Sequence, residues 1–493
     1  MNWLNARIVS ALVVWALVLV APVAEAASRQ QELERFLSKF HRLNQFNGTV
    51  LVADEKGVVF KKGYGSANFE WQVPNTPDTK FRIGSITKPF TAMVILQLVA
   101  EGTLKLDDKV TTHLPDYRKD TGDRVTIAHI LHHTSGIPNY TTPEFFAGPS
   151  RDPYTVADFV KTFCSGDLEF EPGTKWAYSN SAYFLLGAII EKVTGQTYAQ
   201  ALRQRVLDPL GMKDTGYDVT DTVLPKRASG YEAAPEGLVN ASYLDMSLPY
   251  SAGSMYSTVE DLYRWDRALY TDTLLPAALK QRMFTPALEN YALGWDTSPL
   301  QLHDGKTVLA GLGHSGGING FSTLLVRAPE RKQVVILLDN TSRSAKLMEM
   351  ATGALSILNG IQPRQPKPSI GEVVTATLAK SSVAEAVARY RTLKAQKAGE
   401  YDFSERELNR VGYRLMRTGR VADAIEIFKL NVEMFPAWAN GYDSLGEAYL
   451  KHGNKELAVS NYRRAVELDP KNTGAAEAVQ QLEKAKEAHP APR

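Results

Sequence analysis

The stretch FRIGSITKP, residues 81–89, decides how this chain folds. An apolar run follows it to Ala100, where Gly102 ends the pattern, and this predicts a long helix from about residue 86. Pro89 lacks an N–H and is tolerated only in the first turn of a helix, so the helix must begin close to Ser85. Residues three apart share a helix face, which brings the Lys88 amine within reach of the Ser85 hydroxyl.

This Ser-x-x-Lys spacing is suited to nucleophilic chemistry. Lys88 can take the proton of the Ser85 hydroxyl, and the N–H of Ser85 has no helical acceptor at the start of the helix. A free N–H beside a nucleophile is what an oxyanion hole requires, and the helix N-terminus favours the developing negative charge. Ser-x-x-Lys also recurs by chance, and the alternative interpretation is a helix cap.

A second motif is Tyr178-Ser179-Asn180, preceded by EPGT at 171–174. A tyrosine near a lysine ammonium can lose its proton more easily, so Tyr178 can relay a proton between Ser85 and a leaving group. Asn180 offers an amide to bind substrate. The alternative is that Tyr178 is an aromatic residue packed in a loop.

A third motif is HSGG at 314–317, in a loop or at the start of a strand. Its glycines let the backbone approach a ligand closely, so Gly316 and Gly317 are predicted to bind substrate, and the N–H of Gly317 is a second candidate oxyanion donor. His314 can donate to substrate or to Tyr178. A lone histidine is often structural, and that alternative stays open.

Segments with strand and helix patterns surround these motifs. Alternating segments at 48–53 and 58–64, separated by DEKG, predict a hairpin, and strand patterns return at 307–310, 320–328 and 333–340. Helices are expected near 31–46 and 344–358, and residues 104–288 have helical patterns with loops rich in Pro and Gly. Strands at both ends of a helical middle predict an α+β fold.

In order and character the three motifs resemble the serine β-lactamase and penicillin-binding protein family, nearest its class C and esterase/D-peptidase branch. The resemblance extends over residues 48–358. It includes LHHTSGIP at 131–138, DPLGM at 208–212, SAGS at 251–254 and STVEDL at 257–262. It implies a β-lactamase/transpeptidase-like domain, with an antiparallel sheet flanked by helices and a helical lobe.

The resemblance also implies roles for particular residues. Ser85 would be the acyl-forming nucleophile, Lys88 and Tyr178 the proton-transfer pair, and Asn180 a substrate ligand. The N–H groups of Ser85 and Gly317 would form the oxyanion hole. How Lys88 and Tyr178 divide the base role stays open, and no metal or organic cofactor is implied.

One position departs from the family pattern. True β-lactamases carry Lys-Thr-Gly as the third motif, whose lysine helps to hold a substrate carboxylate, whereas this chain has His314-Ser315-Gly316. Histidine is mostly neutral at pH 7, which favours an esterase or a peptidase acting on D-residues over a penicillin-type carboxylate. Residual β-lactam binding remains compatible with the sequence.

Other motifs in the chain are typical of different chemistry, but each lacks a residue or element that this chemistry requires. GHSGG at 313–317 fits the nucleophile elbow of α/β-hydrolases, but the only histidines after His314 lie in the C-terminal region. The nearby glycines fit a dinucleotide fingerprint without the helix that should follow. His129, His132 and His133 lack the spacing of a zinc site, and the single cysteine, Cys164, has no base beside it.

The N-terminus predicts export. Residues 1–26 contain a short apolar run from Ile8 to Val20, then Pro22 and an Ala-Glu-Ala segment, which indicate a signal peptide cleaved near Ala26. The run is short for a spanning helix, although an uncleaved anchor is the alternative. A periplasmic or secreted protein without a stable membrane span is therefore expected. A net charge of +2 without a dense basic block does not indicate nucleic-acid binding.

The C-terminal region has an internal repeat. Gly412, Gly419 and Phe428 recur 34 residues later as Gly446, Gly453 and Tyr462, which resembles tetratricopeptide repeats. The expected domains are a hydrolase domain at 31–360, a linker and capping helix at 361–403, and an all-α repeat domain at 404–490. Two repeats are few for a stable stack.

Together these features predict an exported serine hydrolase acting through a Ser85 acyl-enzyme on a small ester, peptide or β-lactam. An esterase, a D-aminopeptidase or D,D-carboxypeptidase, and a β-lactamase-like enzyme all fit. A non-catalytic penicillin-binding or cell-wall peptide sensor, and a scaffold acting through its repeats, are the alternatives from other classes. The repeats are expected to bind a protein partner or a second copy of the chain.

Overall fold

The computed structural model describes residues 28–234, 237–342 and 346–488. The chain divides into two compact units. We call them the N-terminal unit, which runs through Gln365 apart from Ala234–Leu238, and the C-terminal unit, which holds that short segment and the chain from Pro366. The expected signal peptide at 1–26 lies outside the described residues. Within those residues, every helix is too short or too polar to cross a membrane.

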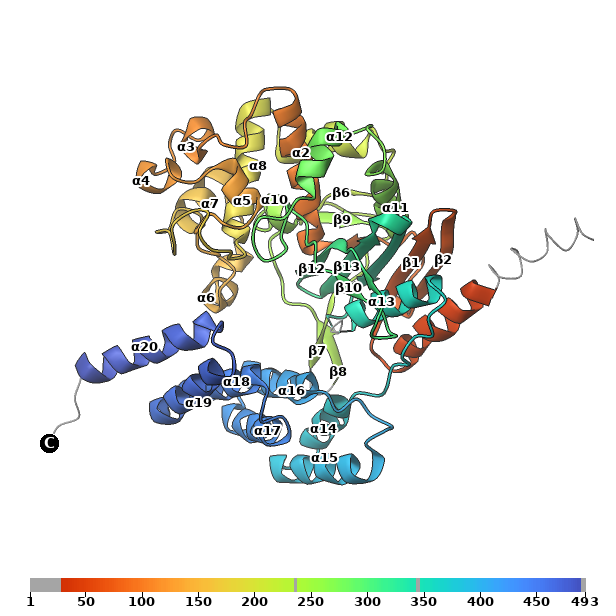
Figure 1. Ribbon diagram of the computed structural model, residues 1–493, viewed down its shortest axis with the longest axis vertical. Coiled ribbons are helices and arrows are strands. Elements are labelled where there is room, and N and C mark those ends of the chain that lie inside the picture. Colours follow the sequence, from red (N-terminus) through yellow and green to blue (C-terminus); the bar gives the residue numbers. More distant parts are fainter. Residues whose placement is uncertain (1–27, 235–236, 343–345, 489–493) are drawn as a thin grey trace, which may run out of the picture. The chain divides into compact units, whose positions relative to one another are not determined.

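The N-terminal unit is built on a five-stranded antiparallel sheet in the order β12-β13-β14-β1-β2 (Figure 1). Strands β1 and β2 form the first hairpin, and β12, β13 and β14 come from the far end of the unit. Their bounds are Gly48–Asp54, Gly57–Tyr64, Leu312–Ile318, Phe321–Ala328 and Gln333–Asp339. Because β1 pairs with β14, the pairing joins the two ends of the unit in one sheet.

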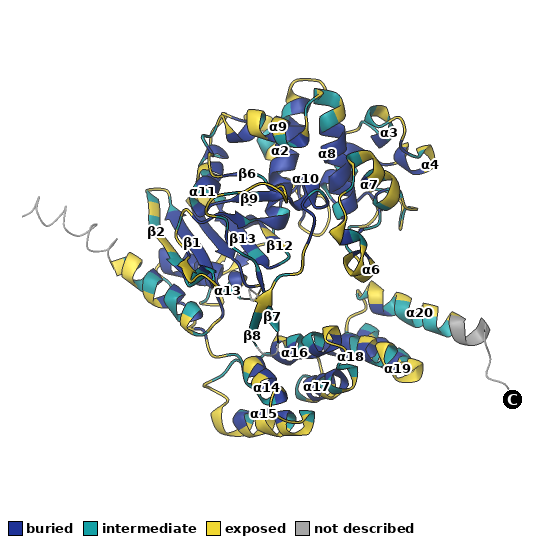
Figure 2. Ribbon diagram, turned by 180° about the vertical axis from the view of Figure 1, so that it is seen from behind, coloured by how far each residue is buried: buried dark blue, intermediate teal, exposed yellow. Residues whose placement is uncertain are grey.

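Alternation along the strands divides the core between the two faces of the sheet. Val50 and Val52 of β1 pack in one cluster with the helix at residues 28–42 and with α13 (Leu347–Leu358). Leu51 and Ala53 belong to a second cluster, which continues into the helices that carry the candidate site. Strands β1 and β13 and helix α8 (Asn180–Thr194) are buried along most of their length (Figure 2).

The second face is covered by a helical lobe whose central helices are α2 (Thr87–Ala100) and α8. The sequence before, between and after these two helices forms shorter helices and two- to four-residue strands. The helices are α3 Val110–His113, α4 Lys119–Gly122, α5 Ile127–Leu131, α6 Pro143–Ala147, α7 Val156–Phe163, α9 Tyr198–Leu202, α10 Tyr250–Gly253, α11 Val259–Ala268 and α12 Ala277–Met283, with the tighter or wider turns η1 Gly84–Ile86, η2 Pro149–Arg151, η3 Arg203–Leu207 and η4 Pro329–Arg331. The short strands are β3 Ser66–Asn68, β4 Val73–Pro74, β5 Phe81–Arg82, β6 Gly216–Tyr217, β7 Tyr231–Ala234, β8 Gly237–Asn240, β9 Met255–Ser257, β10 Leu300–Gln301 and β11 Val308–Leu309.

The α+β prediction is confirmed, and the long strands and α2 lie where the sequence patterns placed them. Sequence analysis did not assign the HSGG segment firmly to a strand, but it forms most of β12. Glycine weakens a strand signal, and here the close packing of the strand against η1 requires it. The strand pattern at 307–310 is confirmed by β11, whereas the other short strands were not predicted, because two to four residues carry little periodicity.

The C-terminal unit consists of antiparallel helix pairs, coloured blue in Figure 1. Their bounds are α14 Ile370–Leu378, α15 Val383–Lys397, α16 Glu405–Arg417, α17 Val421–Met434, α18 Ala439–Lys451, α19 Lys455–Leu468 and α20 Thr473–Ala488. The 34-residue period has a steric cause. A Cβ on Gly412 would lie 2.4 Å from the Phe428 ring, and one on Gly446 would lie 2.9 Å from the Tyr462 ring. Helix α14, which pairs with α15, was not anticipated.

Candidate active site

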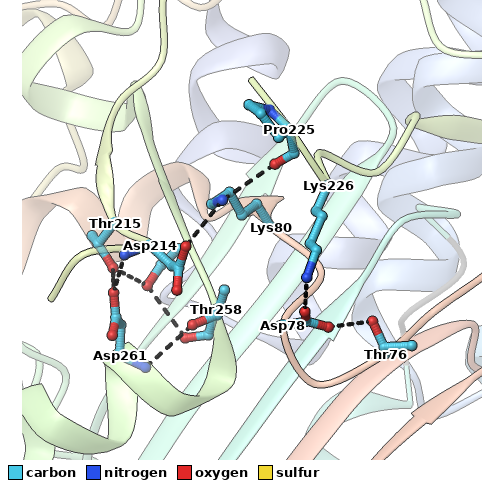
Figure 3. A network of polar contacts seen from close by, with 10 residues as sticks. Thr76, Asp78, Lys80, Asp214, Thr215, Pro225, Lys226, Thr258 and Asp261 are labelled. Atoms are coloured by element: carbon cyan, nitrogen blue, oxygen red, sulfur yellow. Dashed lines mark hydrogen bonds and ion pairs between the residues drawn. The ribbon is translucent and has the colours of Figure 1, made fainter. Parts of the chain in front are cut away.

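The segment before Ser85 is held at several points. Lys80 forms an ion pair with Asp214 (3.0 Å) and donates to the carbonyl of Pro225 (3.2 Å), as Figure 3 shows. The backbone N–H of Lys80 donates to the carbonyl oxygen of Lys226, and the N–H of Ile83 donates to the carbonyl oxygen of Met255 (2.9 Å). These contacts fix β5, so the turn η1 that follows presents Ser85 at the start of α2 in a defined orientation.

Lys88 lies at the centre of the candidate site with its side chain fully buried. Its Nζ is 3.1 Å from the Ser85 Oγ, 2.7 Å from the Asn180 Oδ1 and 2.9 Å from the carbonyl oxygen of Ala252. Burial lowers the pKa of Lys88 well below its usual range. Burial therefore favours the neutral amine over the ammonium form.

Tyr178 lies on the other side of the Ser85 hydroxyl. Its OH donates to the Ser85 Oγ at 2.7 Å, and the Lys88 Nζ lies 4.6 Å from the centre of its ring. Burial raises the pKa of Tyr178 above its usual range, and the hydrogen bond with Ser85 only partly offsets this. Burial therefore favours the protonated phenol of Tyr178.

Asn180 begins α8, and both ends of its amide are engaged. The Oδ1 accepts from Lys88, and the Nδ2 donates to the Thr141 Oγ1 at 3.3 Å. Since Lys88 can only donate to a carbonyl oxygen, the orientation of the amide is fixed. The second N–H of the Asn180 amide has no hydrogen-bond partner among the described residues.

The glycines of the third motif lie on the edge strand β12, beside η1. Gly313 exchanges two hydrogen bonds with Asp296 on the outer side of this strand, each 2.9 Å long. Because backbone groups of a strand alternate in direction, the N–H of Gly317, four residues later, faces the same outer edge. A Cβ on Gly316 would lie 2.0 Å from the carbonyl oxygen of Ile83, whereas one on Gly317 would meet no described atom within 4 Å. Gly316 allows the close packing, and the nitrogen of Gly317 would lie 3.0 Å from a Cβ on Gly84, the residue before Ser85.

Both ring nitrogens of His314 lie against protein atoms. Its Nε2 lies 2.9 Å from the OH of Tyr291, and its Nδ1 lies 2.6 Å from the carbonyl oxygen of Ser315. A carbonyl only accepts, so Nδ1 carries the proton and Nε2 accepts from Tyr291. Burial, followed by the charge of Lys88, lowers the pKa of His314 to about 3. Both ring nitrogens are occupied, and no described contact joins His314 to Tyr178 through a hydrogen bond.

The structure adds two residues that sequence reasoning did not place in the site. Tyr291 binds His314, and the ring of His133 stacks 4.3 Å from that of Tyr178. His133 stands in one of the stretches that carried the family resemblance, so a signal existed for it. Tyr291 had none, because a single aromatic residue in a loop is usually packing. The three nearby histidines have separate partners, and the described residues hold no group of three metal ligands.

A serine hydroxyl contacted by a buried lysine and a tyrosine, beside the edge strand of an antiparallel sheet, is the arrangement of serine hydrolases with a Ser-x-x-Lys motif. The chain belongs to the beta-lactamase family, which it matches over residues 33–358. Residues 439–472 match the tetratricopeptide repeat. The family resemblance inferred from the motifs is thereby confirmed.

Individual relatives give the same picture. Penicillin-binding protein 4* of Bacillus subtilis is 31% identical over 336 residues, which are 64% of this chain and 72% of that protein. The octameric penicillin-binding protein homologue from Pyrococcus abyssi has a TM-score of 0.59 at 29% identity, covering 70% of this chain and 81% of the other. The D-amino acid amidase from Ochrobactrum anthropi SV3, complexed with D-phenylalanine, has a TM-score of 0.58 at 25% identity, covering 68% and 99%.

Proposed function

We propose that this protein is an exported serine hydrolase that cleaves an ester or amide bond through an acyl-enzyme on Ser85. The observation that carries the proposal is the pair of contacts on one oxygen. The Ser85 Oγ lies 3.1 Å from the Lys88 amine and 2.7 Å from the Tyr178 hydroxyl. A base on one side and an acid on the other is the arrangement that nucleophilic catalysis by serine needs.

Lys88 is the base in this proposal, and its partners support that role. Asn180 Oδ1 and the Ala252 carbonyl oxygen can only accept, so they take two N–H groups of Lys88. In the ammonium form the third N–H points at the Ser85 Oγ. In the neutral form the lone pair points there instead, and it can take the serine proton. The two acceptors thus orient the amine for proton transfer.

Tyr178 is the acid. Because its pKa is raised, it keeps its proton in the resting site and can give it to the leaving group when the acyl bond forms. At that moment Lys88 is an ammonium 4.6 Å from the phenol ring, and this charge stabilises the phenolate. The attraction between lysine and phenolate therefore applies after proton transfer, not before it.

In the remaining steps, every proton is taken up and returned by Lys88, Tyr178, water or the leaving group. The Ser85 oxygen attacks the carbonyl carbon, and the N–H groups of Ser85 and Gly317 bind the oxyanion. The tetrahedral intermediate expels the leaving group with the proton from Tyr178. Water then attacks the acyl-enzyme and returns a proton to Tyr178, while Lys88 returns one to Ser85.

Neutral substrates fit this site better than substrates with a carboxylate at the third motif. His314 is held neutral with both ring nitrogens bound, so it offers no charge to a carboxylate. A D-amino acid amidase is among the similar proteins. We infer that esters and amides, including amides of D-residues, are preferred over peptides with a free carboxylate at this position.

The test is the intact mass of the protein after mixing with p-nitrophenyl butyrate, beside a Ser85→Ala variant. Release of nitrophenol with a transient increase of one butyryl group, absent from Ser85→Ala, is expected. A panel of D-amino acid amides and D-peptides with free carboxylates then measures the substrate preference. Absence of both turnover and adduct would instead favour a non-catalytic sensor of cell-wall peptides, and binding to wall fragments would decide that alternative.

Export and the repeats complete the proposal. The apolar segment and the small residues before Ala26 support cleavage of a signal peptide, with domains at 31–360 and 404–490 joined by 361–403. The repeats would bind a protein partner or a second copy of the chain. N-terminal sequencing of the protein from the medium or periplasm tests the export, and mass-resolved chromatography tests self-association.

A further inference from the structure

His133 holds an unusual position in the backbone. It follows the short helix α5 with a φ of +56°, in the left-handed region that is uncommon for residues other than glycine, although histidine adopts it more often than most. The N–H of Thr134 donates to His129 (2.8 Å), which is the bonding of a helix that ends in a left-handed residue. Gly or Asn would serve that ending with less strain. The side chain of His133 is fully buried, so its role follows from its contacts inside the site.

The contacts of His133 surround Tyr178. Its carbonyl oxygen accepts from the N–H of Ala177 at 2.9 Å, and its Nδ1 accepts from the N–H of Ser179 at 3.1 Å. Between these two bonds, its ring packs at 4.3 Å from the ring of Tyr178 with 38° between the planes. One residue therefore holds the backbone on both sides of Tyr178 and also the face of its ring.

This arrangement fixes the form of the imidazole. A backbone N–H only donates, so Nδ1 must be unprotonated and the ring must be neutral with its hydrogen on Nε2. The Nε2 is buried and has no hydrogen-bond partner among the described residues. The rings of Tyr183 and Tyr291 lie 4.8 Å away and close the surroundings. Only the Nδ1 lone pair is used, and it is used on the segment that carries Tyr178.

We propose that His133 is a positioning residue that holds the Tyr178 hydroxyl on the Ser85 Oγ through this bond to Ser179 and the stacking of the rings. This deepens the proposed function and rests on it. The hydroxyl lies 2.7 Å from the Oγ, so a small rotation of the 177–179 segment would break the proton path. His133 itself does not touch the reacting atoms.

Two substitutions test the Nδ1 acceptor of His133 and its ring independently. His133→Asn keeps an acceptor near the Nδ1 position and suits the left-handed backbone, but it loses the ring. His133→Phe keeps a ring against Tyr178 and loses the acceptor. With p-nitrophenyl butyrate and with rates normalised to sites that can be acylated, we expect His133→Phe to lower kcat about 100-fold while KM changes less than about threefold. His133→Asn should recover most of that loss.

Normalisation to acylated sites removes molecules that have not folded. If His133→Phe yields no folded protein, His133→Gly replaces it, because glycine suits the left-handed backbone and also lacks the acceptor. Equal loss in the acceptor-free and Asn variants, or unchanged kcat without the acceptor, would overturn the positioning role. Wild-type protein that forms no Ser85 adduct would overturn the proposed function, and the role of His133 with it.

Discussion

The surroundings of Ser85 and two positions of the C-terminal unit differ in how their buried polar side chains are paired. Near Ser85, the amine of Lys88 has three partners, and both ring nitrogens of His314 are bound. In the C-terminal unit, the hydroxyl of Tyr390 and both amide atoms of Asn431 are buried without a hydrogen-bond partner among the described residues. The difference teaches that hydrogen bonds orient the polar atoms of Lys88 and His314, whereas no described hydrogen bond orients those of Tyr390 and Asn431.

The largest effect should come from Lys88→Ala. Since Ser85, Lys88 and Tyr178 act as a unit, removing the base should lower kcat by about 10⁴-fold, roughly as much as Ser85→Ala does. Single-turnover acylation followed by mass spectrometry measures it. A Lys88→Ala variant that acylates at the wild-type rate would contradict the assignment of Lys88 as the base. The hydrogen bonds of Lys88 would then serve only to hold the fold.

The opposite test removes packing from the C-terminal unit. Phe428 is fully buried against Gly412, so Phe428→Ala should lower the stability of this unit by about 3–5 kcal/mol. The kcat should not change, because Phe428 belongs to no part of the candidate site. Calorimetry and ester turnover measure the two quantities, with Leu457→Ala, at an exposed position, as the control. A parallel fall in kcat would show that the regions are coupled.

The same contrast explains what the sequence could predict. Ser85, Lys88 and Tyr178 were found from motifs because their chemistry needs fixed residue types at fixed spacings. The repeats were found from their period, since a glycine must face an aromatic ring in each copy: Gly412 faces Phe428, and Gly446 faces Tyr462. Tyr291 and the partners of His314 were not found, because hydrogen bonds between segments far apart leave no local pattern. The raised pKa of Tyr178 depends on burial by distant segments, which the local motif Tyr178-Ser179-Asn180 does not reveal.

Acid should destabilise the N-terminal unit through His314. Its pKa is about 3 in the folded chain and about 6.5 when unfolded, so the unfolded state binds more protons between these values and stability falls as pH falls. From pH 7 to pH 5 the loss should be about 2 kcal/mol. Denaturant unfolding followed by tryptophan fluorescence measures it. The side chain of His314→Gln does not titrate, so this variant should lose about 2 kcal/mol less stability than the wild type between pH 7 and pH 5. An equal pH dependence of stability in both proteins would refute the lowered pKa of His314.

The smallest effect compares one chemical change in the two regions. Tyr291→Phe removes the donor to the His314 Nε2 and leaves a buried acceptor unpaired, which should cost about 1–3 kcal/mol. Tyr390→Phe removes a buried hydroxyl that has no described partner, so it should be neutral or stabilising. Unfolding of each unit in both variants measures the difference. Because Tyr291→Phe keeps the ring that packs 4.8 Å from His133 and removes no direct contact with Ser85, its kcat should fall less than about tenfold. Equal costs in the two units would mean that the Tyr390 hydroxyl has a partner after all, such as a buried water, and the contrast between the regions would then lie in packing rather than in polar pairing.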